Sequence, residues 1–302
     1  MVAVKTMQWW IGVTVGFLAA GAPTVQAQAP DWLLPRTRHF AHPRADAMAP
    51  RFAIGLIATD LLSSRGPERP QFTIRDSADA AFDVQAAAAL GGTLPLLRLA
   101  SWAGGGAVLG GEVAVFARFR IEYPSRDAVG TDWFVGMPIE LRRYDWAGRL
   151  ALMHRSAHLG DEFIAASGAQ RIEFGHESIE WMAARHFGTA RIYGGGAWIF
   201  RSNTQFEMRR RGLGEHDRFE LQTGADGEWP LGATGRVYAG LDLQAAERTD
   251  WRTGVAAVVG LGAHGNGRAI RLLARFHDGA SSLGEFFLTD ERFVSLEVEI
   301  EP

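Results

Sequence analysis

The chain has no cysteine, and Lys5 is its only lysine. Without cysteine there is no disulfide framework, no thiol chemistry and no thiolate metal site. Almost all basic residues are therefore arginine, and they are scattered along a chain whose formal net charge is only -3. Proteins that bind nucleic acid usually carry a concentrated basic patch. We therefore expect no nucleic-acid partner.

Long apolar runs are absent beyond the N-terminal region. The longest later run, residues 86–97, contains two glycines and a proline, which excludes an apolar helix long enough to span a membrane. The start of the chain differs, because Lys5 precedes an apolar run over residues 9–20 and small residues follow up to Ala27. This order is typical of a secretory signal peptide. We expect residues 1–27 to be cleaved and the mature protein to be exported.

The rest of the chain shows the alternation of strands rather than the periodicity of helices. Residues 28–50 are rich in proline, histidine and arginine, and predict an irregular periplasmic lead-in. Residues 51–302 predict a single all-β domain of about twelve strands. The predicted strands are residues 51–59, 82–98, 107–122, 132–144, 149–158, 170–185, 190–200, 217–228, 233–246, 251–262, 267–278 and 287–300.

The two faces of the predicted strands differ in polarity. In the last strand, Val294 and Leu296 alternate with Ser295 and Glu297, and the third strand alternates in the same way. Successive side chains of a strand point to opposite sides, so one face is apolar and the other is charged. A soluble barrel or sandwich with an apolar interior would produce this pattern. A membrane barrel with a charged lumen would produce it as well.

The lengths of the connections favour the membrane barrel. Alternate connections between the predicted strands are short and the others are longer, with residues 247–250 as the exception. An even number of strands with short turns at one end and longer loops at the other is typical of bacterial outer-membrane barrels. Tryptophan and tyrosine near several strand ends suit the aromatic girdles of such barrels. We predict an antiparallel transmembrane β-barrel in the bacterial outer membrane, with both termini in the periplasm.

Histidine, serine and acidic residues gather in residues 149–180. In the predicted strand there, His154 and Ser156 continue an apolar face. Polar side chains on a lipid-exposed face are costly, so their presence needs a reason. An imidazole two residues from a serine on one face can take the serine proton during attack on an ester. Glu177, or Glu173, on the following predicted strand could orient that imidazole and stabilise its charged form.

The same residues resemble the sites of two groups of outer-membrane enzymes. Outer-membrane phospholipase A, a twelve-stranded barrel, and the lipid A deacylase barrels use a His-x-Ser pair on the lipid-facing side, with Asn or Glu on the adjacent strand. His154, Ser156 and Glu177 match this pattern, which implies hydrolysis of acyl esters of outer-membrane lipid. Ala157 and His158 replace the small residue and glycine of the phospholipase, so the oxyanion-stabilising group is not matched. Calcium or dimerisation could complete such a site.

A broader resemblance rests on residues 154–163, on Arg171 and Glu177, on residues 193–195 and on residues 276–287. These segments resemble a bacterial family of unknown function, domain of unknown function 1207. The resemblance extends over most of the mature chain. It implies an outer-membrane-type barrel and assigns no activity.

Other interpretations stay open. The His-x-Ser pair could mark the point where a strand enters the headgroup region, where polar side chains are common. His158, Asp161 and Glu162, with His176 as a further ligand, could hold a metal ion. The charged face could line a small-solute pore or be filled by its own side chains, and the barrel could instead bind through its loops. The glycine-rich segments lack the strand-to-helix context of a phosphate loop, so no nucleotide is expected. The oligomeric state stays open.

Overall fold

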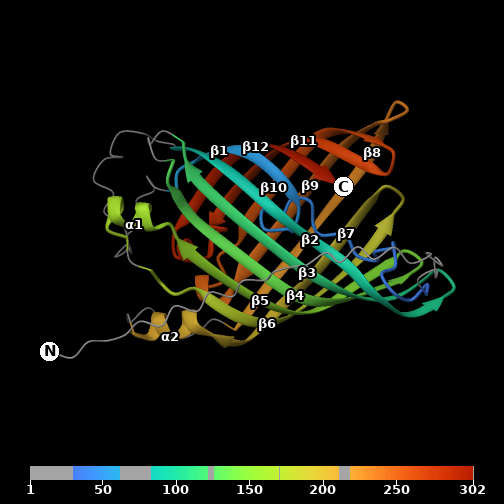
Figure 1. The fold of residues 1–302 in the computed structure, drawn as a ribbon, viewed down its shortest axis with the longest axis horizontal. Coiled ribbons are helices and arrows are strands. Elements are labelled where there is room, and N and C mark those ends of the chain that lie inside the picture. Colours follow the sequence, from blue (N-terminus) through green and yellow to red (C-terminus); the bar gives the residue numbers. More distant parts are fainter. Residues whose placement is uncertain (1–29, 62–82, 122–125, 170, 211–217, 302) are drawn as a thin grey trace, which may run out of the picture. The chain divides into compact units, whose positions relative to one another are not determined.

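Twelve antiparallel strands form one closed barrel within the part of the chain that the structure describes. The structure is a computed structural model, and it describes residues 30–61, 83–121, 126–169, 171–210 and 218–301. Each strand pairs with its neighbour in the sequence, and the first strand pairs with the last to close the barrel (Figure 1). The predicted fold class is confirmed. The predicted signal peptide lies outside the described residues.

The strands, in chain order, are β1 (Phe52–Thr59), β2 (Asp83–Trp102), β3 (Gly105–Arg120), β4 (Ala128–Arg143), β5 (Trp146–Leu159), β6 (Gly175–Phe187), β7 (Ala190–Ser202), β8 (Phe219–Leu231), β9 (Gly235–Ala246), β10 (Gly254–Gly265), β11 (Arg268–Ala280) and β12 (Asp290–Glu301). The strand predicted to begin at residue 170 begins five residues later, at Gly175. Most of the predicted loop between β1 and β2 lies outside the described residues.

The apolar faces of the strands point out of the barrel. In β12, Val294 and Leu296 are each 55% exposed, whereas Ser295 and Glu297 are 2% and 4% exposed. A soluble barrel would bury the apolar residues and expose the charged ones. The observed arrangement is that of a membrane-spanning barrel, whose outer surface contacts lipid while polar side chains fill the interior.

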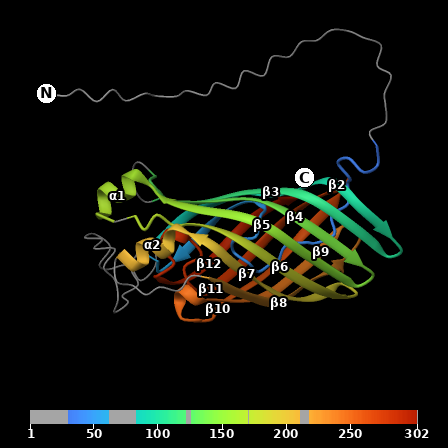
Figure 2. The ribbon, with the colours of Figure 1, turned by 90° about the horizontal axis from the view of Figure 1, so that it is seen from below.

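The two ends of the barrel differ. Tight turns join the strands at one end, and the longer connections lie at the other (Figures 1 and 2). The end with the longer connections is called the loop end below. Its connections contain the helices α1 (Asp161–Ser167) and α2 (Asn203–Arg210). The connection after β9, predicted as a short exception, extends over residues 247–253 and contains the 3-10 helix η1 (Glu247–Thr249). The asymmetry of the connections is therefore more regular than the sequence suggested.

Local sequence explains α1, which the strand pattern did not predict. Asp161 and Glu162 lie in its first turn, where acidic side chains interact favourably with the helix dipole. The helix ends at Gly168, whose φ of 68° is the left-handed conformation that glycine adopts easily. The described residues include no helix that is long and apolar enough to cross a membrane.

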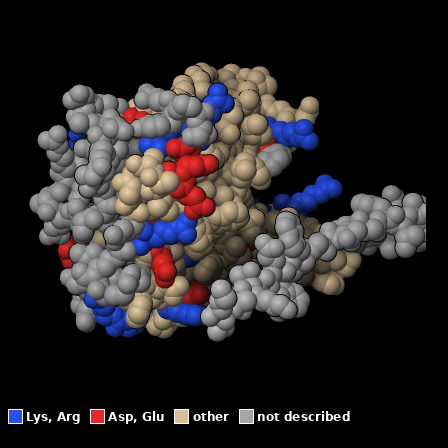
Figure 3. All heavy atoms as spheres, turned by 60° about the vertical axis from the view of Figure 1, so that its left-hand side comes forward, with Lys and Arg blue, Asp and Glu red and all other residues tan. Residues whose placement is uncertain are grey.

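A small apolar core joins the loops at this end. The aromatic rings of Phe163 in α1 and Phe286 in η2 (Gly284–Phe286) lie 6.0 Å apart. Both belong to a buried cluster whose members come from five connections and strand ends: Leu61, Val129, Leu159, Phe163, Ala169, Leu283 and Phe286. On the surface of the described part of this end, acidic and basic side chains lie side by side rather than forming a surface of one sign (Figure 3).

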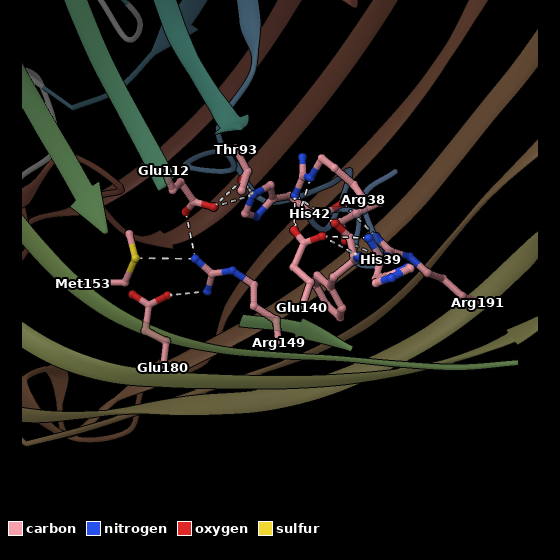
Figure 4. A network of polar contacts seen from close by, with 12 residues as sticks. Arg38, His39, His42, Thr93, Glu112, Glu140, Arg149, Met153, Glu180 and Arg191 are labelled. Atoms are coloured by element: carbon pink, nitrogen blue, oxygen red, sulfur yellow. Dashed lines mark hydrogen bonds and ion pairs between the residues drawn. The ribbon is translucent and has the colours of Figure 1, made fainter. Parts of the chain in front are cut away.

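Residues 38–51, called the strap below, run inside the barrel. Phe40 is 2% exposed and Ala45 is fully buried. The Glu140 carboxylate of β4 accepts hydrogen bonds from the Arg38 side chain, at 2.7 Å, and from the backbone N–H groups of His39 and Phe40, at 2.7 and 3.1 Å (Figure 4). The sequence predicted that this segment is irregular, but it did not predict that it fills part of the lumen.

Two arginines of the barrel wall donate hydrogen bonds to backbone carbonyl oxygens of the strap. Arg191 of β7 donates to the carbonyls of Ala41 and His42, at 2.6 and 2.7 Å. Arg275 of β11 donates to the carbonyl of Arg44 at 2.9 Å. Because these contacts are to the strap backbone, they hold its path through the barrel largely independently of its side chains.

Candidate functional site

The predicted site lies on the outward face of β5. His154 and His158 are exposed there, in line with the apolar Leu150 and Leu152, and Ser156 lies between the two histidines and is half-buried. The neighbouring residues of the strand point into the barrel. The arrangement follows from strand alternation alone, so the sequence could place these side chains on one face.

His154 and Glu177 are directly opposed on β5 and β6. His154 Nδ1 lies 3.4 Å from Glu177 Oε1, within ion-pair distance, and the two side chains are 49% and 30% exposed. Glu173, the alternative acid considered from the sequence, precedes β6 and has no strand partner among the described residues. Of the two glutamates, the structure therefore brings Glu177 to the imidazole.

Ser156 has Trp133 of β4 on one side and Gly175 of β6 on the other, both directly opposed to it. Trp133 is 46% exposed. No hydrogen bond joins Ser156 Oγ to His154 among the contacts of the described residues. Catalytic hydrogen bonds are often long or absent without substrate and shorten when it binds, so this geometry is compatible with a nucleophile and its base.

Arg201 extends the row formed by His154 and Glu177. It is opposed to Glu177 from β7, and its Nε lies 3.8 Å from Glu177 Oε2. The side chain is 74% exposed, so this pair contributes little stability by itself. Arg201 could not be predicted as a site residue, because a register shift between Glu177 and Ser178 places it beside the glutamate and alternation cannot reveal such a shift.

The proposed metal ligands do not form a cluster. The described residues contain no group of three or more histidine, cysteine or acidic side chains that could hold a metal ion. His158 is exposed at the end of β5, while His176 is buried and points into the barrel from β6. Asp161, at the start of α1, is 91% exposed and lies 2.6 Å from an Arg171 nitrogen. Glu162 follows it in the first helical turn.

The lumen contains a second group of polar residues, and their charges are mutually paired. Arg149 of β5 donates to Glu112 at 2.8 Å and to Glu180 at 3.0 Å (Figure 4). Glu112 also accepts a hydrogen bond from Thr93 and lies 3.0 Å from His42 of the strap. A cavity of about 210 Å³ is lined in part by these residues. The strap and the paired side chains fill much of the remaining interior.

Comparison with protein families identifies residues 71–300 as a match to the family described as protein of unknown function, DUF1207. The match extends over more than half of the chain. The chain belongs to this family. The residues from which the sequence suggested DUF1207 all lie within the matched range. Membership assigns no activity, so the activity must be argued from the site.

Comparison with solved structures identifies outer-membrane barrels. The outer membrane phospholipase dimer with bound calcium from Salmonella typhi is 14% identical, with a TM-score of 0.50, covering 86% of this chain and 94% of that chain. Outer membrane phospholipase A from Escherichia coli is 15% identical, with a TM-score of 0.51, covering 83% of this chain and 96% of that chain. At such low identity these similarities show a shared fold. No curated protein sequence matches the chain.

Proposed function

We propose that this outer-membrane barrel hydrolyses acyl esters of outer-leaflet lipid, with Ser156 as nucleophile, His154 as general base and Glu177 as the residue that orients His154. One observation carries the proposal. On the outward surface, His154 Nδ1 lies 3.4 Å from Glu177 Oε1, and Ser156 stands two residues along the same face. Contact with Nδ1 leaves Nε2 as the nitrogen that can face the serine, as in other serine hydrolases.

The expected reaction is acyl transfer through the serine. His154 takes the proton of Ser156 as Oγ attacks the ester carbonyl, and the Glu177 carboxylate stabilises the imidazolium that forms. Collapse of the tetrahedral intermediate breaks the ester bond, and the leaving alcohol takes the proton from His154. Water then releases the fatty acid from the acyl-serine by the same proton transfers in reverse order.

The position of the site along the barrel suits a lipid ester. Ser156 is level with Trp133, its exposed partner on β4, and aromatic residues of this kind mark the boundary between acyl chains and headgroups. The ester bonds of a membrane lipid lie at that boundary. The two outer membrane phospholipases named above share the fold, which is consistent with the proposal.

A small-solute pore is less well supported. The strap and paired charges such as Arg149 with Glu112 occupy much of the lumen. No observation in the described residues favours an open path through the barrel.

The test is release of fatty acid from phosphatidylethanolamine and from lipopolysaccharide in mixed micelles by the refolded mature protein. Wild type would be assayed with added calcium and with a chelator, beside Ser156→Ala, His154→Ala and Ser178→Ala. Ser178 is a buried, inward-facing serine on the adjacent strand, so its variant is a matched control. We expect loss of release in the first two variants only, with the barrel still folded. Full activity in Ser156→Ala, or no release by wild type under any condition, would contradict the proposal.

A further inference from the structure

A glycine lies beside Ser156, and its backbone is buried. Gly175 is directly opposed to Ser156, and directly opposed residues of an antiparallel pair point to the same side of the sheet. The backbone of Gly175 does not adopt a positive φ, so its conformation does not require glycine. A Cβ placed there would have as its nearest neighbours the Arg155 carbonyl oxygen at 3.7 Å and Asn203 Nδ2 at 3.8 Å. The missing side chain thus leaves room for a methyl group beside the Asn203 amide.

The Asn203 side chain is not used by the fold around it. Ser202 caps α2, because its Oγ accepts the backbone N–H of Gln205 at 3.1 Å, in the Ser-x-x-Gln pattern of a capping box. Thr204 Oγ1 accepts the backbone N–H of Gly175 at 3.1 Å and so fixes the start of α2 beside β6. Asn203 itself is exposed, and its side chain has no hydrogen-bond partner among the described residues. Its amide is therefore free to bind something outside the protein.

Attack on an ester requires a donor that the strand backbone does not provide. The carbonyl oxygen becomes an oxyanion, and hydrolases stabilise it with fixed N–H groups. The backbone N–H of the residue after the nucleophile often serves, but here the N–H of Ala157 donates to the Phe174 carbonyl at 3.0 Å. This backbone donor is therefore occupied, and a side-chain N–H can take its place.

We propose that Asn203 is a further catalytic residue, whose Nδ2 donates to the substrate carbonyl oxygen beside Gly175. The inference rests on the proposed function, since it needs Ser156 as the nucleophile. As the bond from Ser156 Oγ to the carbonyl carbon forms, the electron pair of the C=O double bond moves to the oxygen that Asn203 holds. The serine proton goes to His154. The electron pair returns when the ester bond breaks and the leaving alcohol takes the proton from His154, and water then hydrolyses the acyl-serine.

The first test replaces the donor. Asn203→Asp keeps the shape of the side chain and removes its N–H groups, and Asn203→Ala removes both. We expect kcat for phosphatidylethanolamine in mixed micelles to fall by about 10²–10³, the usual cost of losing one oxyanion donor, with KM changed by less than about threefold. Arg209→Gln, at an exposed position of the same helix, is the control and should keep full activity. Folding is checked by the electrophoretic mobility of unheated samples.

The second test adds a side chain at Gly175. A Cβ at Gly175 would make only ordinary contacts, so Gly175→Ala should fold. Gly175→Val adds two further carbons, and its folding is checked by the same electrophoretic mobility. We expect kcat to decrease from glycine to alanine to valine, because the added carbons occupy the place of the oxyanion. Wild-type kcat in both Asn203 variants, with Ser156→Ala inactive, would overturn this inference and leave the proposed hydrolase intact. Full activity in Ser156→Ala would instead overturn the proposed function.

Discussion

His154 and Glu177 face each other across neighbouring strands on the outside of the barrel, with Nδ1 3.4 Å from Oε1. We predict that Glu177→Gln lowers kcat by about 10–100-fold, because the neutral amide no longer stabilises the imidazolium. This is less than the loss of about 10⁴ for a buried triad acid, since both side chains here are partly exposed. Glu173→Gln, which changes an acid of the same segment away from the imidazole, is the matched control. Equal kcat in the two variants would remove Glu177 from the site.

The second prediction concerns the strap. Glu140→Ala removes the carboxylate that accepts hydrogen bonds from the Arg38 side chain and from the backbone N–H groups of His39 and Phe40. We expect the strap contact to weaken by about 2–3 kcal/mol, somewhat less than for a fully buried pair because Arg38 is 32% exposed. Ion conductance in planar bilayers should rise above that of wild type.

Glu228→Gln is the comparison variant for the strap. Its partner is Arg44, and the two side chains are 36% and 27% exposed, so this pair should contribute less than about 1 kcal/mol. We expect conductance close to that of wild type. If the folded Glu140→Ala protein also conducts like wild type, the Glu140 carboxylate does not hold the strap in place.

The third prediction is a pH dependence of the loop end. Glu285 in η2 is 2% exposed, and this burial raises the pKa of its carboxyl above the ordinary value of 4.5, although the N–H of Ile172 donates to it at 2.7 Å. A raised pKa in the folded state means that folding is favoured while the group is protonated. This stability is fully present below the unfolded pKa and is lost as the pH rises through the folded pKa.

Glu285→Gln should remove that dependence. The measurement is hydrogen exchange of the Ile172 amide as a function of pH above 4.5, in wild type and in the variant. We expect protection to fall with rising pH in wild type, beyond the intrinsic change of the exchange rate, and to stay level in the variant. Parallel profiles would show that Glu285 does not titrate in this range.

The fourth prediction concerns the apolar core of the loop end. Phe163 is fully buried against Phe286, so Phe163→Ala should cost about 3–5 kcal/mol of local stability. Because the barrel strands are paired around the full circle, we expect faster proteolysis in the loops while the barrel stays folded. Ile164→Ala, at a partly buried neighbour, should have a smaller effect. Equal proteolysis of Phe163→Ala and wild type would show that this ring does not order the loops.

Much of the fold could be predicted because the strand period is short and local. Val294 and Leu296 face lipid, and Ser295 and Glu297 face the lumen, as alternation requires. The same rule placed His154 and Ser156 on one outward face. Boundaries were harder to predict where turn chemistry or a short helix interrupts the pattern, as in α1, whose acidic first turn and final glycine the strand pattern did not reveal.

Only the tertiary structure decided which residues of different strands lie beside each other. Glu177 reaches His154, and Gly175 lies beside Ser156, because of the register between β5 and β6, which depends on pairing along the whole strand. Asn203 is the first residue of α2, directly after β7, and lies 47 residues after the serine in sequence number. Sequence periodicity could not predict the path of the strap either, because its irregular backbone is held by Glu140, Arg191 and other residues of the barrel wall that are far away in the chain. The sequence alone determined which residues each strand turns outward, because alternation is local. Their partners were decided by barrel closure, because register is a property of the whole sheet.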